Sequence, residues 1–386
     1  MALDGLRTVY TTSDGNLYVY DSGKSAIQLT QGVRESTEYR PPLISDDGQK
    51  IIFYRAGASN LDSVYTINAD GTDEQVLVNP ALLSVFGNEY NKFTTLFSLV
   101  FVPGTHLLLF NTYQQSNFDP ETAGWLPIVG NDLFVVNTDT GKITQLKVPW
   151  QGGNFLVAPN GKWVAVQTLD HIDVIDIQGQ MIHRNLVTYM KSEAHVVVPM
   201  SWTSDSQELI ILPSEIPLFV GGVPIERNIW RYPVNSDSGI EIKLTPSVAY
   251  DAYAVSPDGN WIAYSYDTEG LDPQTTSGVY LGNLRDGTSQ LIYEPQPNEN
   301  TGFVDVPLYY DTWSPDNINF VFHDDLIFMG NIHGEIVSLG WGTGILGWID
   351  DKHYVLGTGS VGDIDNIIVP HEYIYRDPIA FVYLGQ

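Results

Sequence analysis

The sequence predicts an all-β protein, specifically a β-propeller of four-stranded antiparallel blades. Three observations predict this fold class: one strand–turn–strand unit recurs seven times, a second such unit alternates with it seven times, and almost no stretch has helical periodicity. The repeat period is about 50 residues with four strands per repeat, which is typical of propeller blades.

The first recurring unit is a strand, a tight polar turn and a second strand. Its turns contain pairs such as Asp47-Gly48, Asn160-Gly161 and Asp258-Gly259, which supply the positive φ angles that hairpins need, between β-branched or aromatic residues. FVPGTH and TSDSQE depart from this turn pattern. The seven copies are PPLISDDGQKIIFYRAG, SLVFVPGTHLLLFNTYQ, NFLVAPNGKWVAVQTLD, PMSWTSDSQELIILPSE, YAVSPDGNWIAYSYDTEG, YDTWSPDNINFVFHDD and LGWIDDKHYVLGTGS.

The second unit is another hairpin, which supplies the remaining two strands of each repeat. Together the two units give strands a to d, counted outward from the propeller axis. The seven copies are LYVYDSGKSAIQLT, VYTINADGTDEQVLV, LFVVNTDTGKITQLKV, IDVIDIQGQMIHRNLV, IWRYPVNSDSGIEIKLT, VYLGNLRDGTSQLIY and IFMGNIHGEIVSL.

These units predict one propeller domain over residues 1–386, with its ring closed by N- and C-terminal strands. Seven blades are favoured, closed by pairing a hairpin near 345–359 with a hairpin near 16–30, because an open ring would leave strand edges unpaired. Two further strand-like stretches, RTVYTTS and IAFVYLGQ, predict an incomplete eighth blade as the alternative.

The repeats VSPDGNWIAY, ISDDGQKIIF and WSPDNINFVF, alternating with units such as VYTINADG, resemble those of TolB-like propellers, relatives of WD-repeat domains. The resemblance covers nearly the whole chain and concerns the fold, since such propellers share their repeats across many functions. It implies a bacterial interaction module in the periplasm or outside the cell, and a cytoplasmic location stays open.

The lengths of the connections predict which side of the propeller binds. The a–b and c–d turns are short, whereas the long segments are all b–c or d–a connections, which emerge on the same side. Long loops in compact domains are uncommon unless they are functional or disordered. The long segments are 79–96, 112–131, 213–228, 267–278 and 294–306.

Several of these long segments carry large apolar residues, which is typical of anchors in protein interfaces. The alternative is that they fold down as a cap over the blade rims. Trp125 and Phe219 are the strongest candidates, because each lies within a long loop near glycine or proline. The full partner-binding set is Phe86, Tyr90, Phe118, Trp125, Leu126, Leu218 and Phe219.

Composition restricts the partners. Lys and Arg number 18 against 46 Asp and Glu, a formal charge of -28, which repels nucleic acid and anionic membranes and favours basic protein patches. No cysteine is present, no apolar run is long enough to span a membrane, and the opening MALDGLRTVY lacks the regions of a signal peptide. We therefore expect a monomer that binds an unidentified protein partner, without nucleic acid and without a membrane span.

The sequence contains partial matches to known catalytic and nucleotide-binding motifs, but each lacks a residue or a neighbouring element that the motif requires. GTGILG and GTGSVG have the spacing G-x-G-x-x-G, but strand-like residues follow where a dinucleotide site needs a helix. Neither GKSAI nor GSVGD fits the serine-hydrolase elbow, and HEYIY has Tyr375 where a metalloprotease needs a second histidine. No catalytic residue is predicted.

For a metal, calcium is the only ion that the sequence suggests, and no cofactor is otherwise predicted. Asp267, Glu269 and Asp272 could supply carboxylate oxygens, as could the cluster of His323, Asp324 and Asp325. A solvated acidic loop is the alternative, because EF-hand spacing does not occur. The eight histidines are scattered along the sequence.

A recurrent tryptophan near strands a and b is predicted to fill the wedge between blades, with carbohydrate stacking as the alternative. These tryptophans are Trp163, Trp202, Trp261, Trp313 and Trp348.

The sequence therefore predicts a non-catalytic binding or scaffold propeller that uses the side with the long b–c and d–a connections. Two alternatives stay open. One is an enzyme with an axial active site, of the lyase, lactonase or glycosidase class. The other is the propeller domain of a larger peptidase.

Overall fold

The computed structural model of the chain describes the strands given below, most of the short turns between them and parts of the long connections. The described residues are 7–11, 16–21, 24–31, 42–56, 62–87, 95–113, 118–119, 124–125, 132–149, 151–168, 171–188, 199–211, 219–220, 223–224, 229–236, 238–246, 253–266, 278–294, 313–324, 326–340, 344–350, 353–357 and 381–383. They form two compact units, Met1–Val197 and Val198–Gln386, called units 1 and 2 below.

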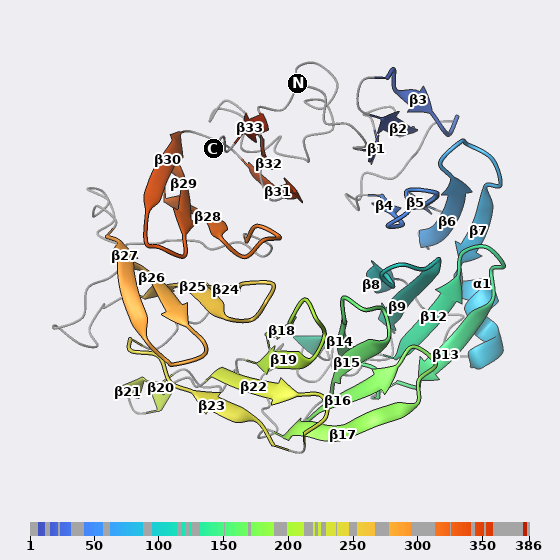
Figure 1. Cartoon of the computed structure of the whole chain (residues 1–386). Coiled ribbons are helices and arrows are strands. Elements are labelled where there is room, and N and C mark those ends of the chain that lie inside the picture. The colour runs from blue at the N-terminus through green and yellow to red at the C-terminus, as the bar shows by residue number, and fades with distance from the viewer. Residues whose placement is uncertain are drawn as a thin grey trace. The chain divides into compact units, whose positions relative to one another are not determined.

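Among its described residues, unit 1 contains one three-stranded and three four-stranded antiparallel sheets in chain order (Figure 1), besides a two-stranded sheet described below. The first has β1 (Arg7–Thr11), β2 (Leu17–Asp21) and β3 (Ile27–Gln28), and the second has β4 (Leu43–Ile44), β5 (Lys50–Ala56), β6 (Asp62–Asn68) and β7 (Gln75–Val78). The third has β8 (Thr95–Phe101), β9 (Leu107–Tyr113), β12 (Leu133–Asn137) and β13 (Ile143–Lys147), and the fourth has β14 (Asn154–Val157), β15 (Trp163–Gln167), β16 (His171–Asp176) and β17 (Met181–Thr188).

The described residues of unit 2 repeat the pattern with two four-stranded and two three-stranded sheets, again besides a two-stranded sheet. Its first sheet has β18 (Met200–Trp202), β19 (Glu208–Ile211), β22 (Ile229–Pro233) and β23 (Ile240–Ile242), and its second has β24 (Tyr253–Val255), β25 (Trp261–Tyr266), β26 (Gly278–Asn283) and β27 (Ser289–Tyr293). The third has β28 (Asn319–Asp324), β29 (Leu326–Asn331) and β30 (Ile336–Gly340), and the last has β31 (Gly344–Asp350), β32 (His353–Gly357) and β33 (Phe381–Tyr383).

The predicted fold class is confirmed: the chain is an all-β protein of the β-propeller class, made of antiparallel blades. Within each sheet the strands pair in chain order, as a blade requires. The third sheet of unit 2 gains the equivalent of a fourth strand from an isolated antiparallel bridge between Trp313 and Phe320. All seven copies of each predicted hairpin thus occur as antiparallel pairs or, in this one case, as a bridge.

The number of blades stays a prediction. The stretches RTVYTTS and IAFVYLGQ, which the seven-blade count leaves unassigned, each contain a strand. Strand β1 of the first stretch pairs with β2, and strand β33 of the second pairs with β32. Strand β2 therefore has β1 on one edge and β3 on the other, while β32 lies between β31 and β33. Both terminal sheets are three-stranded in the described part of the chain, which is the kind of partial sheet that the eight-blade alternative includes.

The hairpin turns have the predicted backbone. Gly48, Gly161 and Gly259 have φ of 69°, 65° and 68°, in the left-handed region that glycine adopts without steric cost. In TSDSQE, Ser206 keeps this conformation with φ of 60° despite its side chain. In FVPGTH the positive φ, 70°, falls one position earlier at Gly104, as in a type II turn with Pro-Gly at its centre.

Apolar residues on both faces of the inner strands form the core, because each sheet packs against its neighbours in the unit. In unit 1, one cluster joins the first two sheets through side chains that include Leu17 and Phe53, and another joins the second and third sheets through Leu77 and Phe110. In unit 2 a large cluster extends across three sheets and includes Tyr264 and Phe322.

The only helices among the described residues are one turn of α-helix, α1 (Pro80–Leu83), and the 3-10 turn that follows it, η1 (Ser84–Phe86). Asn79 caps α1, because its side chain accepts a hydrogen bond from the Leu82 N–H. No helix in the described part of the chain has the length and apolar character needed to cross a membrane.

Candidate functional site

The b–c connections contain two small hairpins that the blade pattern does not require. In the chain segment that connects β9 to β12, strands β10 (Phe118–Asp119) and β11 (Gly124–Trp125) pair with each other. In the segment that connects β19 to β22, strands β20 (Phe219–Val220) and β21 (Val223–Pro224) pair with each other. We call these the first and second ribbons; β20 and β21 of the second ribbon are labelled in Figure 1. Each ribbon interrupts the return from strand b to strand c, at the end of the sheet opposite the short a–b and c–d turns.

The ribbons contain the two residues that the sequence favoured as anchors. Trp125 lies directly opposite Phe118 in the first ribbon, and Phe219 lies opposite Pro224 in the second. The register therefore pairs two aromatic positions of the first ribbon with each other, and their role in binding a partner stays a prediction.

The d–a connection after β7 shows how one predicted anchor packs. Phe86, in η1, is half-buried and meets Phe134 edge-on, with ring centroids 5.2 Å apart. This packing is what the cap alternative predicts for Phe86. By contrast, Val85 is 79% exposed and Leu82 is 42% exposed, so the same turn also presents apolar surface to solvent.

The remaining candidates lie outside the described residues. For partner binding these are Tyr90, Leu126 and Leu218, and for calcium they are Asp267, Glu269 and Asp272. Among the residues that the structure does describe, no group of three or more histidine, aspartate or glutamate side chains could hold a metal ion. A calcium site on the 267–278 connection therefore stays a prediction.

At the opposite end of the sheets, four a–b turns share one hydrogen-bonding motif. A serine or threonine hydroxyl donates to the carboxylate two residues later at 2.6–2.7 Å, and the same carboxylate accepts a backbone N–H two residues further on. The motif explains why serine or threonine and aspartate recur in the sequence repeats. The four pairs are Ser45 and Asp47, Thr203 and Asp205, Ser256 and Asp258, and Ser314 and Asp316.

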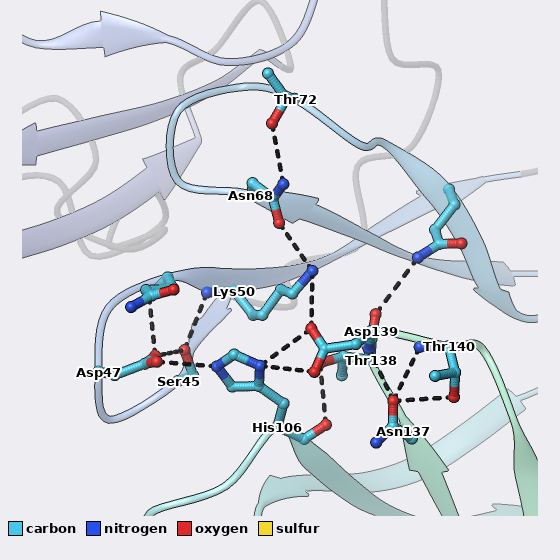
Figure 2. A network of polar contacts seen from close by, with 12 residues as sticks. Ser45, Asp47, Lys50, Asn68, Thr72, His106, Asn137, Thr138, Asp139 and Thr140 are labelled. Carbon is cyan, nitrogen blue, oxygen red and sulfur yellow. Dashed lines mark hydrogen bonds and ion pairs between the residues drawn. The ribbon is translucent and has the colours of Figure 1, made fainter.

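In unit 1 one of these turns joins a polar network between two neighbouring sheets (Figure 2). His106, in the β8–β9 turn, lies between two carboxylates. Its Nε2 is 2.9 Å from Asp47 Oδ2 in the β4–β5 turn, and its Nδ1 is 2.9 Å from Asp139 Oδ2 in the β12–β13 turn. The Lys50 Nζ lies 3.1 Å from Asp139 Oδ1 and donates to Asn68 Oδ1 at 2.8 Å.

The network changes the acidity of its members. Burial lowers the pKa of His106, but hydrogen bonds to Asp139 and Asp47 outweigh it, so this pKa lies above its ordinary value. The hydroxyl of Ser45 is the main reason that the pKa of Asp47 falls to about 2, against the opposing effect of burial. Burial raises the pKa of Asp139, but hydrogen bonds from His106 and Lys50 bring it below its ordinary value.

A second buried cation, Arg231 of β22, joins two sheets in unit 2. The side chain is 3% exposed and forms an ion pair with Glu208 of β19. Its Nη1 donates to the carbonyl of Gly259, 2.6 Å away in the β24–β25 turn, and to that of Leu284 at 3.4 Å. Arg231 therefore neutralises a carboxylate in its own sheet while it satisfies backbone carbonyls in the next one.

These polar residues were not identified from the sequence, although a signal for them exists. The chain has only 18 Lys and Arg, and Lys50 and Arg231 stand in two largely apolar strands. These strands are KIIFYRA, which also contains Arg55, and IWRYP. A basic residue in a buried strand needs an acidic partner, because an unpaired buried charge is costly. A basic residue within an apolar strand could therefore have predicted that Lys50 and Arg231 are buried and paired. Their partners could not be predicted in this way, because they lie in other strands and turns.

Of the tryptophans predicted to fill the wedge between blades, Trp313 packs between two sheets. Trp313 is 5% exposed, packs against Phe320 with centroids 4.8 Å apart, and donates from Nε1 to the Ala254 carbonyl of the adjacent sheet at 2.8 Å. Trp202 is also buried, while Trp163 and Trp261 are half-buried. The side chain of Trp348 lies outside the described residues.

Comparison with known proteins gave structural matches alone. No protein-family model matches the chain, and no curated protein matches it. An oligogalacturonate lyase from Vibrio parahaemolyticus is 14% identical, with 84% of this chain and 82% of that one covered and a TM-score of 0.49. TolB from Acinetobacter baumannii is 13% identical, with 85% and 77% covered and a TM-score of 0.39. The β-propeller domain of the trilobed protease from Pyrococcus furiosus is 11% identical, with 93% and 90% covered and a TM-score of 0.41.

These TM-scores all lie below 0.5, so the fold assignment is based on the sheets themselves. The sheets repeat in chain order, and four of their a–b turns share one hydrogen-bonding motif. In its repeats and its sheets, this chain is similar to the TolB-like and WD-repeat-like β-propellers.

Proposed function

We propose that this chain is a non-catalytic binding or scaffold propeller that holds a protein partner at the ends of its sheets that carry the b–c and d–a connections. The observation that supports it most is where structure has been added to the blades. Both ribbons lie in b–c connections and α1 lies in a d–a connection, while the described a–b and c–d turns are short. Elaboration confined to one end of a repeated sheet is typical of a binding surface carried on a rigid scaffold.

The chemistry of the ribbons suits a protein partner. Aromatic residues are enriched in the centres of protein interfaces, where they bury large areas with few rotatable bonds. The first ribbon has Phe118 and Trp125 at one paired position, and the second has Phe219 next to Val220. With a formal charge of -28, the chain favours a partner with a basic surface around the apolar contact.

The test replaces Trp125 and Phe219 by alanine, singly and together, and measures affinity capture from an extract of the source organism. If Trp125 is an anchor, its loss weakens capture by about 2 kcal/mol, or roughly thirtyfold in Kd, while the melting temperature changes little. Ile27→Ala is the matched control, because Ile27 is a large apolar residue that is 53% exposed on the outer strand β3.

The opposite result would assign the ribbons to the cap alternative. In that case Trp125→Ala would melt several degrees lower and would capture the same proteins in the same amounts. If Ile27→Ala weakens capture of the partner as much as Trp125→Ala does, the binding is a non-specific apolar contact. Either result would contradict the proposed surface.

The enzymatic alternative is tested with the same preparation. The likeness to oligogalacturonate lyase has a TM-score of 0.49 and does not argue for that reaction. Incubation with oligogalacturonate, with and without divalent metal ions, would nevertheless show a lyase directly through the ultraviolet absorbance of an unsaturated product. Turnover by the wild-type chain would overturn the non-catalytic proposal, whatever the ribbon variants do.

The resemblance to TolB-like propellers also favours a location outside the cytoplasm. Fractionation of the source cells, followed by immunodetection, tests this part of the proposal. Recovery of the protein in the cytoplasmic fraction alone would contradict it.

A further inference from the structure

His106 contacts two carboxylates at once, and this arrangement has a chemical requirement. A neutral imidazole has one N–H and one lone pair, so it can donate to a single carboxylate. Here both ring nitrogens lie 2.9 Å from carboxylate oxygens, Nε2 from Asp47 and Nδ1 from Asp139. Both contacts are favourable only when both ring nitrogens carry protons, which makes the ring an imidazolium.

The three residues belong to two different sheets of unit 1. Asp47 lies in the β4–β5 turn of the sheet β4 to β7, whereas His106 and Asp139 lie in turns of the sheet β8–β9–β12–β13. Figure 2 shows the ring lying between the two carboxylates. The contact between Nε2 and Asp47 therefore joins neighbouring sheets, and it coexists with the contact between Nδ1 and Asp139 only when each ring nitrogen carries its own proton.

The charged groups around His106 favour the protonated ring. Lys50 Nζ, from β5, lies 3.1 Å from Asp139 Oδ1, so Asp139 is shared between two cations from two sheets. Asp46 adds a third carboxylate to the junction, and its Oδ2 accepts the Gly104 N–H at 2.6 Å. The junction thus contains three carboxylates and Lys50, while Arg7 donates to the Gly48 carbonyl of the β4–β5 turn at 2.8 Å and pairs with Asp21. An imidazolium on His106 reduces the remaining excess of negative charge.

We propose that a proton on His106 locks the junction between the sheets β4–β7 and β8–β9–β12–β13, and that deprotonation of this histidine at higher pH loosens the junction. The locked form is the stable one at mildly acidic pH, where His106 is protonated. As the ring loses its proton, Nε2 or Nδ1 faces a carboxylate with a lone pair, and one of the two contacts becomes repulsive.

The direction of the pH effect follows from the pKa of His106, which is higher in the folded protein than its ordinary value. The folded state therefore binds this proton more tightly than the unfolded chain does. The stability that the proton contributes is fully present below about pH 6.5, the pKa of an unperturbed histidine. It is lost as the pH rises through the higher folded-state pKa.

The first test compares the wild-type chain with His106→Gln, which keeps a polar side chain but cannot become a cation. At about pH 5.5 the variant should melt roughly 2 to 4 °C below the wild type, a small shift because the carboxylates are partly exposed. At about pH 8.5 most of this difference should disappear. His333→Gln is the control, because His333 is exposed in the β29–β30 turn. A difference between His106→Gln and wild type that does not depend on pH would overturn the proposal.

The second test needs no change to His106 and holds even where His106→Gln does not fold. An NMR titration of the histidine side chains should place the pKa of His106 above about 6.5, and Asp139→Asn should lower it. Asp176→Asn is the matched control, because Asp176 occupies the corresponding β16–β17 turn and accepts N–H groups of Gln178 and Gln180. A His106 that titrates at or below about 6.5, or that ignores Asp139→Asn, would refute the lock.

Hydrogen exchange reports on the junction itself. The Gly104 N–H, which donates to Asp46 across the two sheets, should be better protected in the wild type than in His106→Gln at acidic pH. The two proteins should become equal in alkaline solution. Protection of Gly104 that is the same in both proteins at every pH would show that the proton on His106 does not hold the sheets together.

Discussion

Replacing Arg231 by methionine should destabilise unit 2 strongly, because the buried guanidinium makes several contacts that methionine cannot replace. The side chain is 3% exposed and forms an ion pair with Glu208, which is itself 17% exposed. It also donates to the Gly259 carbonyl at 2.6 Å and to the Leu284 carbonyl at 3.4 Å. Methionine fills a similar volume but leaves the carboxylate and the carbonyls without these donors.

The expected loss follows from these contacts. Breaking a buried ion pair by removing one partner costs about 3 to 5 kcal/mol, because the remaining charge stays buried. Partial exposure of Glu208 and the long contact to Leu284 favour the lower end, about 3 kcal/mol. Urea unfolding followed by tryptophan fluorescence measures this loss as a lower midpoint.

A second variant separates the charge from the packing. Glu208→Gln combined with Arg231→Met removes the uncompensated carboxylate, so the double variant should recover about 1 kcal/mol or more relative to Arg231→Met. Arg285→Met is the control, because Arg285 is exposed and should change stability by only about 0.5 kcal/mol. A loss below about 1 kcal/mol for Arg231→Met, or no recovery in the double variant, would refute this account of the buried pair.

Two further predictions concern turn geometry and acid stability. Gly161→Ala should cost about 3 kcal/mol in urea unfolding, because residue 161 has φ of 65° and an added Cβ would lie 2.4 Å from the Pro103 carbonyl oxygen. Gly141→Ala, with φ of 69° and open space around the added Cβ, should cost only about 1 kcal/mol, and equal losses would contradict the predicted clash. In acid, hydrogen bonds from Arg7 lower the pKa of Asp21 to about 2 in the folded state. The stability that Asp21 contributes is therefore present above about pH 4 and disappears as the pH falls through the folded-state value. Asp21→Asn should be less stable than the wild type at about pH 5 and equal to it in strong acid, and a gap that persists there would exclude this ion pair as its cause.

The sequence predicted the blades because their signals are local. Alternating apolar residues and a turn such as Asp258-Gly259 lie within one hairpin, so a short window contains all the information that the hairpin needs. The same is true of the connections, whose lengths predicted that additional structure would lie between strands b and c. The two ribbons occur there, at Trp125 and Phe219.

The sequence did not predict the polar network, since its members are far apart along the chain. His106 is 59 residues from Asp47 and 33 from Asp139, and no repeat pattern connects these three positions. The role of Phe86 also depended on packing, because a phenylalanine in a long segment can equally face a partner or a core. Its edge-on contact with Phe134 is a tertiary fact.

The sequence by itself determined that this chain forms antiparallel blades, that their turns need positive φ, and that the protein is strongly acidic. Tertiary structure alone decided which partners the charged side chains contact. His106 contacts Asp47 across two sheets, and Arg231 donates to the carbonyl of Gly259 in the next sheet. The physical reason is the range of the interactions. Backbone conformation and strand patterning act over a few neighbouring residues, whereas a buried charge is stabilised by whichever partners the packing of whole sheets brings within about 3 Å.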